Sequence, residues 1–211
     1  MPNFTARRLL PRSLPLLWFL SIAIALGSFR FLVADMALVM PDMVHHALAQ
    51  PWSLYLHIAV APLLLLLLPL QFNAKLRQQR PVLHRWAGRL YALLILVSGS
   101  AALALAPQVS AGPVAGLGFG LLALVWIAVT AVAVWQAMQG RIAAHRRWMI
   151  RSAALTLAAV SLRVFLLLGV PIFGFEATYV AVSWLSWVGN LLIAEWLLHR
   201  QRLPLGTKKP A

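Results

Sequence analysis

His84 and His145 are the residues best placed to do chemistry, because each stands beside arginines at the start of a long apolar stretch. If both stretches are helices, the two imidazoles lie at one depth on different helices, as axial ligation of a b-type haem requires. Arg89 and Arg151 could neutralise the haem propionates. A quinone could instead accept hydrogen bonds from the same groups. Gln71, at the end of the preceding apolar stretch, completes this candidate cofactor site.

The same residues have a second interpretation. His84 is followed by Arg85, and His145 by Arg146 and Arg147, so each histidine could be one more polar residue of a basic interfacial loop. Histidine is a common metal ligand and also an ordinary interfacial residue. The pattern names no catalytic residue and leaves open whether the protein is an enzyme.

Glu195 is the acid expected among the cationic side chains at this depth. An unpaired charge inside a membrane is costly, so we predict an ion pair between Glu195 and Arg151 or Arg89. Such a pair could be a structural clasp or part of a ligand site.

A second polar group is expected at the other membrane face. Arg30, Arg163 and His57 fall inside apolar stretches, where ionisable residues are functional candidates. Arg163 is expected to face the interior, and His57 could form a second cofactor site with His45 or His46. The structural alternative pairs Arg30 with Asp35, and Arg163 with Glu176.

Other chemistries find little support. The chain has no cysteine, which excludes disulfides and thiolate ligands. It has no phosphate loop, zinc-protease helix, Ser-His-Asp pattern or nucleotide fingerprint. Asp42 and His46 have i, i+4 spacing, but one such pair is a weak signal and we assign no metal site. Redox chemistry would therefore need a bound cofactor.

Six apolar stretches must position these residues. A membrane about 30 Å thick needs about 20 apolar helical residues, and six segments qualify: 14–34, 52–72, 89–106, 114–138, 148–170 and 178–198. Aromatic residues near their ends, Tyr91 among them, are expected at the membrane interfaces. We predict an all-α, single-domain bundle over 1–205 and a disordered tail over 206–211.

The basic residues predict the orientation of these spans. Of the 18 Lys and Arg, all but Arg30 and Arg163 fall in segments 7–12, 75–89, 141–151 and 200–209. A six-span layout puts these four segments on one face, and an excess of Lys and Arg marks the cytoplasmic side. The termini are therefore expected in the cytoplasm of a bacterial cell, with the first span kept as an anchor in the inner membrane.

Composition agrees with a membrane protein. Hydrophobic residues make up 62% of the 211 and charged residues 10%, whereas soluble domains are about a quarter charged. The net charge of +14 lies in loops, where anionic lipid headgroups attract each cation by roughly 1 kcal/mol. We therefore expect the bilayer as the partner, no nucleic acid, and a membrane-protein partner or a second copy as further options.

Several separated polar positions resemble one family. They are His57, Gln71-Phe72, Leu76-Arg77, Arg80-Pro81, His84-Arg85, Gly88-Arg89 and Tyr91, then His145-Arg146 and Trp148-Met149-Ile150-Arg151-Ser152. Together they resemble the predicted membrane proteins called domain of unknown function 2306. Ala153-Ala154 depart from that family, whose members often carry an aromatic there. The resemblance implies a membrane bundle, marks His57, Gln71, Arg77, His84, Arg89, His145, Trp148 and Arg151 as matching positions, and supplies no reaction.

Two functions from different classes remain open. The first is a small redox membrane protein that binds a b-type haem or a quinone. The second is a non-enzymatic protein, either a small transporter or a structural subunit of a membrane complex. Pro62 and Pro69 lie inside the second apolar stretch and could kink it, opening a polar path between His57 and Gln71, or simply bend a packed helix.

Overall fold

The computed structural model describes residues 14–200, and within that range all regular structure is helical. Six helical spans are long and apolar enough to cross a membrane, which confirms the predicted all-α six-span bundle. They are α1 (Leu14–Ser28, continued by η1, Phe29–Leu32), α4 (Pro51–Phe72), α6 (Pro81–Leu105), α7 (Pro113–Met138), α8 with α9 (Ile142–Thr156 and Ala158–Phe173) and α10 (Phe175–Arg200). The segment 206–211, predicted to be a disordered tail, lies outside the described residues.

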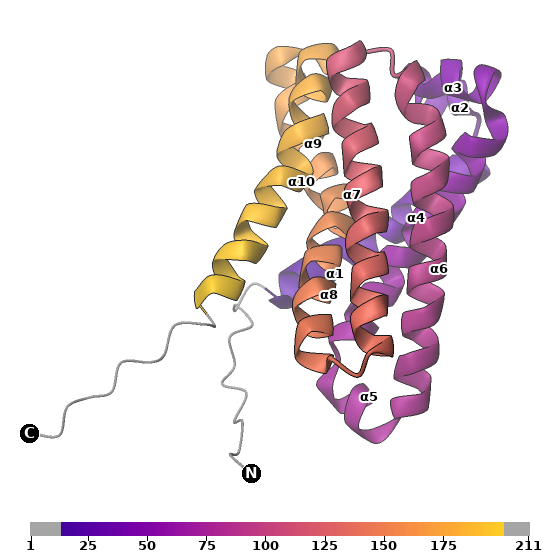
Figure 1. The fold of residues 1–211 in the computed structure, drawn as a ribbon. Coiled ribbons are helices and arrows are strands. Elements are labelled where there is room, and N and C mark those ends of the chain that lie inside the picture. Colours follow the sequence, from indigo (N-terminus) through magenta and orange to yellow (C-terminus); the bar gives the residue numbers. More distant parts are fainter. Residues whose placement is uncertain (1–13, 201–211) are drawn as a thin grey trace, which may run out of the picture.

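The two ends of the bundle differ (Figure 1). One end carries α5 (Ala74–Gln79) and the turn from α7 to α8, and we call it the basic end because most of the described Lys and Arg lie there. The other end carries η3 (Ala106–Gln108), the turn from α9 to α10 and a cap made of α2 (Met36–Val39), η2 (Pro41–Met43) and α3 (Val44–Ala49). We call it the capped end.

Local sequence explains where the spans begin. Pro51, Pro81 and Pro113 are the first residues of α4, α6 and α7, where the missing N–H of proline costs no helical hydrogen bond. Asn73 caps α5 by accepting from the Leu76 N–H at 3.0 Å. Gly140, in the turn from α7 to α8, has a φ of +70° that side chains rarely adopt.

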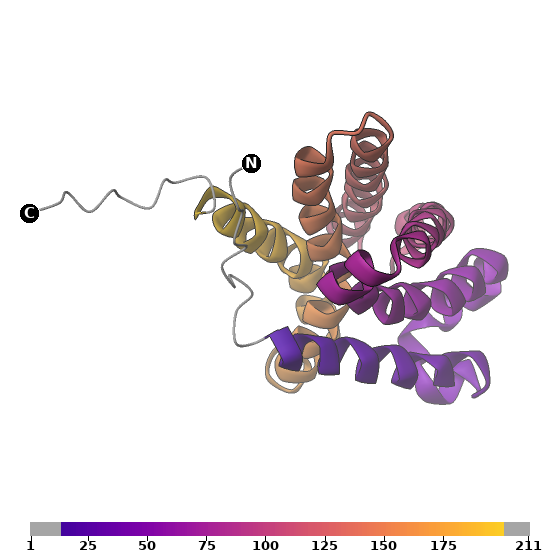
Figure 2. The same cartoon turned by 90° about the horizontal axis from the view of Figure 1, so that it is seen from below.

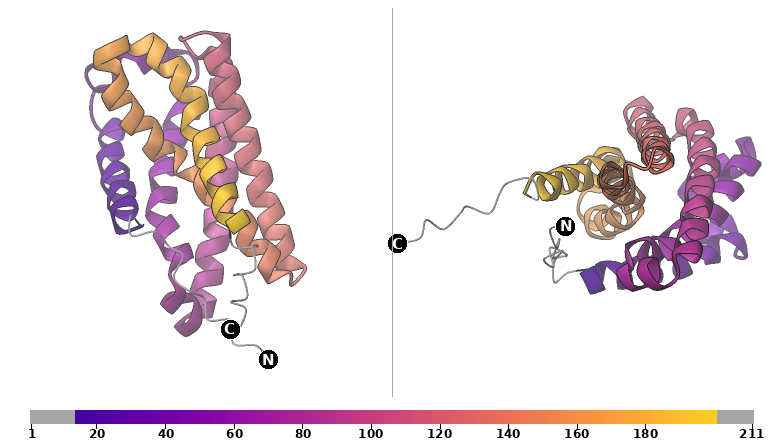
Figure 3. Two further views of the ribbon diagram at one scale, coloured as in Figure 1. Left: turned by 90° about the vertical axis from the view of Figure 1, so that its left-hand side faces the viewer. Right: turned by 60° about the horizontal axis from the view of Figure 1, so that its bottom comes forward.

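The spans pack mainly as neighbours along the chain: α4 on α6, α7 on α8, and α9 on α10. Helix α1 packs on α4 and lies at the periphery, as seen from the basic end (Figure 2). Helix α10 runs obliquely across the bundle (Figure 3). It comes so close to α7 that a Cβ on Gly118 would lie 2.8 Å from the Ser183 carbonyl oxygen. The longest buried run is in the fifth span, from Ser152 to Thr156, so that span is central.

Two helices begin earlier than the hydropathy pattern predicts. α6 starts at Pro81 and α8 at Ile142, rather than at residues 89 and 148, because polar first turns continue each helix beyond its apolar part. His84 and His145 therefore belong to the first turns of helices and not to loops.

The span that is interrupted is the fifth, and not the second span with its two internal prolines. α4 runs continuously through Pro62 and Pro69, whereas the fifth span breaks at Leu157, between α8 and α9. There the Val160 N–H bonds to the Leu157 carbonyl, a tighter i to i−3 step. Asn190 of α10 bridges the break: its Nδ2 donates to the Ala154 carbonyl at 3.1 Å, and its Oδ1 accepts from the Ser161 hydroxyl at 2.9 Å.

Candidate functional site

His84 and His145 approach each other at the basic end. Each is the fourth residue of its helix, α6 or α8, and they lie close enough for charges on the two rings to interact. Arg77 of α5 lies within the same range of His84. The structure therefore brings together the two imidazoles that the sequence placed at one depth.

The neighbours of His145 fix its ring. Its Nδ1 donates to the Ala133 carbonyl of α7 at 2.8 Å, which leaves the lone pair on Nε2. Gln136, one turn further along α7, has a buried side-chain oxygen without a hydrogen-bond partner among the described residues. On α7, the Ala133 carbonyl thus accepts a hydrogen bond from His145, and the Gln136 amide oxygen one turn away has no partner among the described residues.

Gln71 borders the site from α4. Its Oε1 would lie 3.3 Å from a Cβ on Gly88, so the amide packs on α6 one turn from His84. Gln71 Nε2 and His84 Nδ1 are both buried and lack partners among the described residues. Gln71, His84, Gln136 and His145 thus come from α4, α6, α7 and α8 at the basic end, and we call this set the inner polar site.

The flanking charges divide into two kinds. Arg151 donates through Nε and Nη2 to the two carboxylate oxygens of Glu195, at 2.5 and 2.9 Å, so the predicted ion pair forms with Arg151. Arg89 is exposed, and its guanidinium lies over the Trp86 ring at 4.8 Å. Within residues 14–200 Arg89 therefore forms no ion pair, while Arg151 is paired with Glu195.

A hydroxyl network lies between the two ends. The Tyr91 hydroxyl is 2.5 Å from Thr156 Oγ1, which also accepts from the Trp126 indole N–H at 3.1 Å. Beside it, the Ser152 and Thr130 hydroxyls are 2.7 Å apart. Tyr91 is fully buried, so its expected place at the membrane interface is wrong: its hydroxyl finds partners inside the bundle.

His57 lies towards the capped end and is held by α6. Its Nδ1 is 3.0 Å from both the carbonyl oxygen and the hydroxyl of Ser98. His45 instead bonds the Gln108 carbonyl at 3.0 Å, and its ring lies 4.0 Å from that of His46. The structure thus gives His57 a hydroxyl partner and places no contact between it and the predicted partners His45 and His46.

Arg163 of α9 is half-buried and bonds only neutral acceptors. Its Nη1 donates to the Ala159 carbonyl at 3.1 Å, and its Nη2 to the Ser28 hydroxyl at 3.0 Å. Neither alternative pair, Arg30 with Asp35 or Arg163 with Glu176, forms, since Arg151 with Glu195 is the ion pair found within residues 14–200. Arg30 is exposed and stacks at 4.8 Å over Phe31.

The cap at this end contains a buried imidazole. His46 is 3% exposed, and burial, with a smaller contribution from the charge of His45, lowers its pKa to about 4. His46 is therefore neutral at physiological pH. No group of three or more potential metal ligands occurs within residues 14–200.

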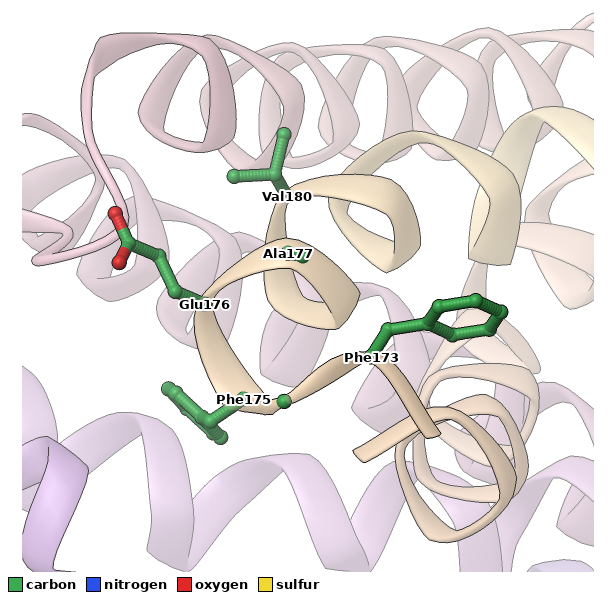
Figure 4. A pocket seen from close by; sticks show the side chains of 6 residues that line it. Phe173, Phe175, Glu176, Ala177 and Val180 are labelled. Atoms are coloured by element: carbon green, nitrogen blue, oxygen red, sulfur yellow. The ribbon is translucent and has the colours of Figure 1, made fainter. Parts of the chain in front are cut away.

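An open depression of about 670 Å³ lies at the turn from α9 to α10, lined by Phe173, Phe175, Glu176 and Val180. Glu176 and Phe173 project to opposite sides of this turn (Figure 4). The depression holds none of the candidate residues except Glu176, so it is separate from the inner polar site.

Sequence reasoning missed several partners. Gln136 was overlooked, although it ends an apolar stretch at the basic end as Gln71 does, and that shared pattern could have found it. Ser28 and Ser98 carry no signal of their own, because a single serine in an apolar helix usually bonds its own backbone.

Six spans with buried polar residues near both ends define a polytopic helical membrane protein. The chain belongs to the family described as predicted membrane protein, DUF2306, whose model matches residues 54–198, from α4 through α10. This confirms the resemblance seen in the separated polar motifs. No curated protein and no solved structure matches the chain.

Proposed function

We propose that the protein is a redox membrane protein that binds a b-type haem at the inner polar site, with His84 and His145 as axial ligands. The observation that carries this proposal is the approach of two imidazoles from α6 and α8 at one depth. A bound b-type haem supplies one-electron chemistry at its iron.

The donor set of this site agrees with the proposal at one ligand and is incomplete at the other. A ligating histidine usually donates its second ring N–H to a carbonyl or carboxylate, as His145 does to Ala133. His84 has no such acceptor on Nδ1. Gln71, against α6 one turn away, is the side chain placed to supply one.

Helix spacing and charge also support the proposal. Helices α6 and α8 are not among the closely packed pairs of the bundle, and side chains such as Tyr91 and Thr156 connect them. Arg77 lies close enough to His84 for their charges to interact, and it would hold a haem carboxylate by charge-assisted hydrogen bonds.

A quinone is the second candidate for the same site. Gln71 Nε2 and His84 Nδ1 are buried hydrogen-bonding atoms without partners, and leaving such groups unpaired is unfavourable. A quinone carbonyl accepts hydrogen bonds and would satisfy them without any metal.

The break in the fifth span favours a different class, a small transporter, since transporters often have interrupted helices near the middle of the membrane. In that case purified protein would be colourless, and solute flux would depend on His57 and Arg163. If the protein is instead a structural subunit of a membrane complex, it would co-purify with a fixed partner.

The orientation belongs to the same proposal. The Lys and Arg of α5, of the turn from α7 to α8 and of the end of α10 support a cytoplasmic basic end in a bacterial inner membrane. The haem would then lie near the cytoplasm, with anionic lipid headgroups around it.

An absorption spectrum of detergent-purified protein from haem-replete cells tests the proposal. We expect a Soret band at stoichiometric haem, lost in His84→Ala and in His145→Ala. His57→Ala is the matched control, because His57 bonds Ser98 away from this site, and should keep the band. Colourless wild-type protein that remains folded would overturn haem binding, and solvent extraction of the same sample would then detect a bound quinone.

A further inference from the structure

Arg163 is a charged side chain in a membrane span, and it has no ion-pair partner among residues 14–200. Its two hydrogen bonds go to a carbonyl and to the Ser28 hydroxyl, both neutral. A cation in this environment is unfavourable unless it is paired or reaches the polar interface. Ser28 is the last residue of α1, so the guanidinium extends to the level at which α1 ends.

A second cation stands beside it. Arg30 lies close enough to Arg163 for their charges to repel each other, and His57 lies within the same range of Arg163. Arg30 follows α1 directly, in η1, and is exposed. Two positive charges are thus held near each other at the capped end.

The acids of the capped end do not neutralise this pair. The Asp35 carboxylate caps α2 by accepting from the Ala37 N–H at 2.9 Å. Asp42 lies within electrostatic range of Tyr179, and Glu176 lines the depression at the turn from α9 to α10. None of the three forms an ion pair in the structure described over 14–200. Within residues 14–200, the two guanidinium groups therefore have no carboxylate at ion-pair distance.

The arginine pair is accessible from the side of the bundle. Gly27 next to Ser28 is exposed and has open space within 4 Å of an added Cβ. The neighbouring apolar residues Leu26 and Leu167 are 59% and 75% exposed, as lipid-facing residues are. Arg30 is exposed and Arg163 partly exposed, so both guanidinium groups can be approached from the lipid-facing side.

We propose that Arg163 and Arg30, with Arg163 positioned by Ser28, bind a phosphate group at the capped end. Guanidinium groups hold phosphate oxygens through paired, charge-assisted hydrogen bonds. The phosphate belongs either to a phospholipid headgroup of that leaflet or to a free phosphate ion, since both present the same oxygens. This site is independent of the inner polar site and of haem binding.

The test measures phosphate binding to detergent-purified protein in two arms. In one arm, native mass spectrometry and thermal unfolding follow retention of, and stabilisation by, added phosphatidylglycerol. In the other, thermal unfolding is followed during titration with inorganic phosphate. Stabilisation by lipid alone identifies a headgroup site, and stabilisation by inorganic phosphate identifies a site for the free ion.

We expect Arg163→Gln to weaken binding by about tenfold or more, since it removes charge-assisted hydrogen bonds. Arg30→Gln should also weaken it, and because Arg30 is exposed this variant tests the site even if Arg163→Gln folds poorly. Arg141→Gln is the matched control, an exposed arginine over Trp135 at the basic end, and should bind as wild type does. No stabilisation in either arm, or equal binding by all three variants, would overturn the proposal.

Discussion

The basic and capped ends each combine histidine with arginine, yet they differ in how the arginine charge is met. Both ends contain buried polar atoms without hydrogen-bond partners among residues 14–200: those of Gln71, His84 and Gln136 at the basic end, and those of His46 and Gln108 at the capped end. At the basic end Arg151 is paired with Glu195, whereas at the capped end Arg163 bonds neutral acceptors and forms no ion pair within these residues. Unpaired polar atoms therefore do not distinguish the two ends, and the uncompensated charge of Arg163 does.

We expect the largest effect from a substitution in the hydroxyl network that lies between the two ends. Thr156→Val keeps the shape of the side chain but removes the acceptor of the Trp126 N–H and one partner of the Tyr91 hydroxyl. An unpaired buried donor costs about 1–3 kcal/mol, so we expect the free energy of unfolding to fall by about 2 kcal/mol. Denaturant unfolding in detergent measures it.

Thr156→Ser is the matched control, because it keeps the hydroxyl and should retain most of the stability. A valine variant as stable as wild type would mean that this hydroxyl network contributes nothing to holding α6, α7 and α8 together.

Opposite effects at the two ends would sharpen the comparison. Gln71→Met replaces an unpartnered buried amide with an apolar side chain of similar shape, and should stabilise the cofactor-free protein by about 1 kcal/mol. His57→Leu removes a satisfied hydrogen bond to Ser98 and should destabilise it by about 1 kcal/mol. Thermal unfolding of protein from haem-depleted cells compares them. A loss of stability in Gln71→Met would show that its amide has a structural partner.

The smallest effect concerns the cap. The pKa of His46 is lowered to about 4, so the unfolded chain takes up a proton between about pH 6.5 and pH 4 that the folded chain does not. Stability should therefore fall as the pH falls through this window, by less than about 1 kcal/mol at pH 6. Melting temperatures measured from pH 7 to pH 6 test this.

His45→Gln should reduce the pH dependence only in part, because burial is the larger cause of the lowered pKa. A pH dependence that disappears in His45→Gln would instead assign the effect to the pair of rings.

Most of the fold could be predicted from the sequence, because span length and the placement of Lys and Arg follow from the physics of the bilayer. The pairing of Glu195 with Arg151 was predictable for the same reason: a carboxylate at that depth needs a cation. The approach of His84 to His145 followed from their positions a few residues before two apolar stretches that share one direction.

The side-chain partners inside the bundle depend on the orientation of each helix about its own axis, which hydropathy does not specify. Arg163 was expected to face the interior, with Glu176 as its alternative partner, and it bonds Ser28, 135 positions away in the chain. Tyr91 was expected at the interface, but it faces Thr156. No proline or glycine at Leu157 marks the break in the sequence. The residue that stabilises the break, Asn190, comes from another helix.

The break also has a mechanical consequence, because α8 carries His145 and α9 carries Arg163. An uninterrupted helix would transmit any tilt of one half to the other as a stiff rod. Here the halves meet at one tighter turn that Asn190 bridges, so displacement of α10 at Asn190 would act where the helix that carries the imidazole meets the helix that carries the guanidinium.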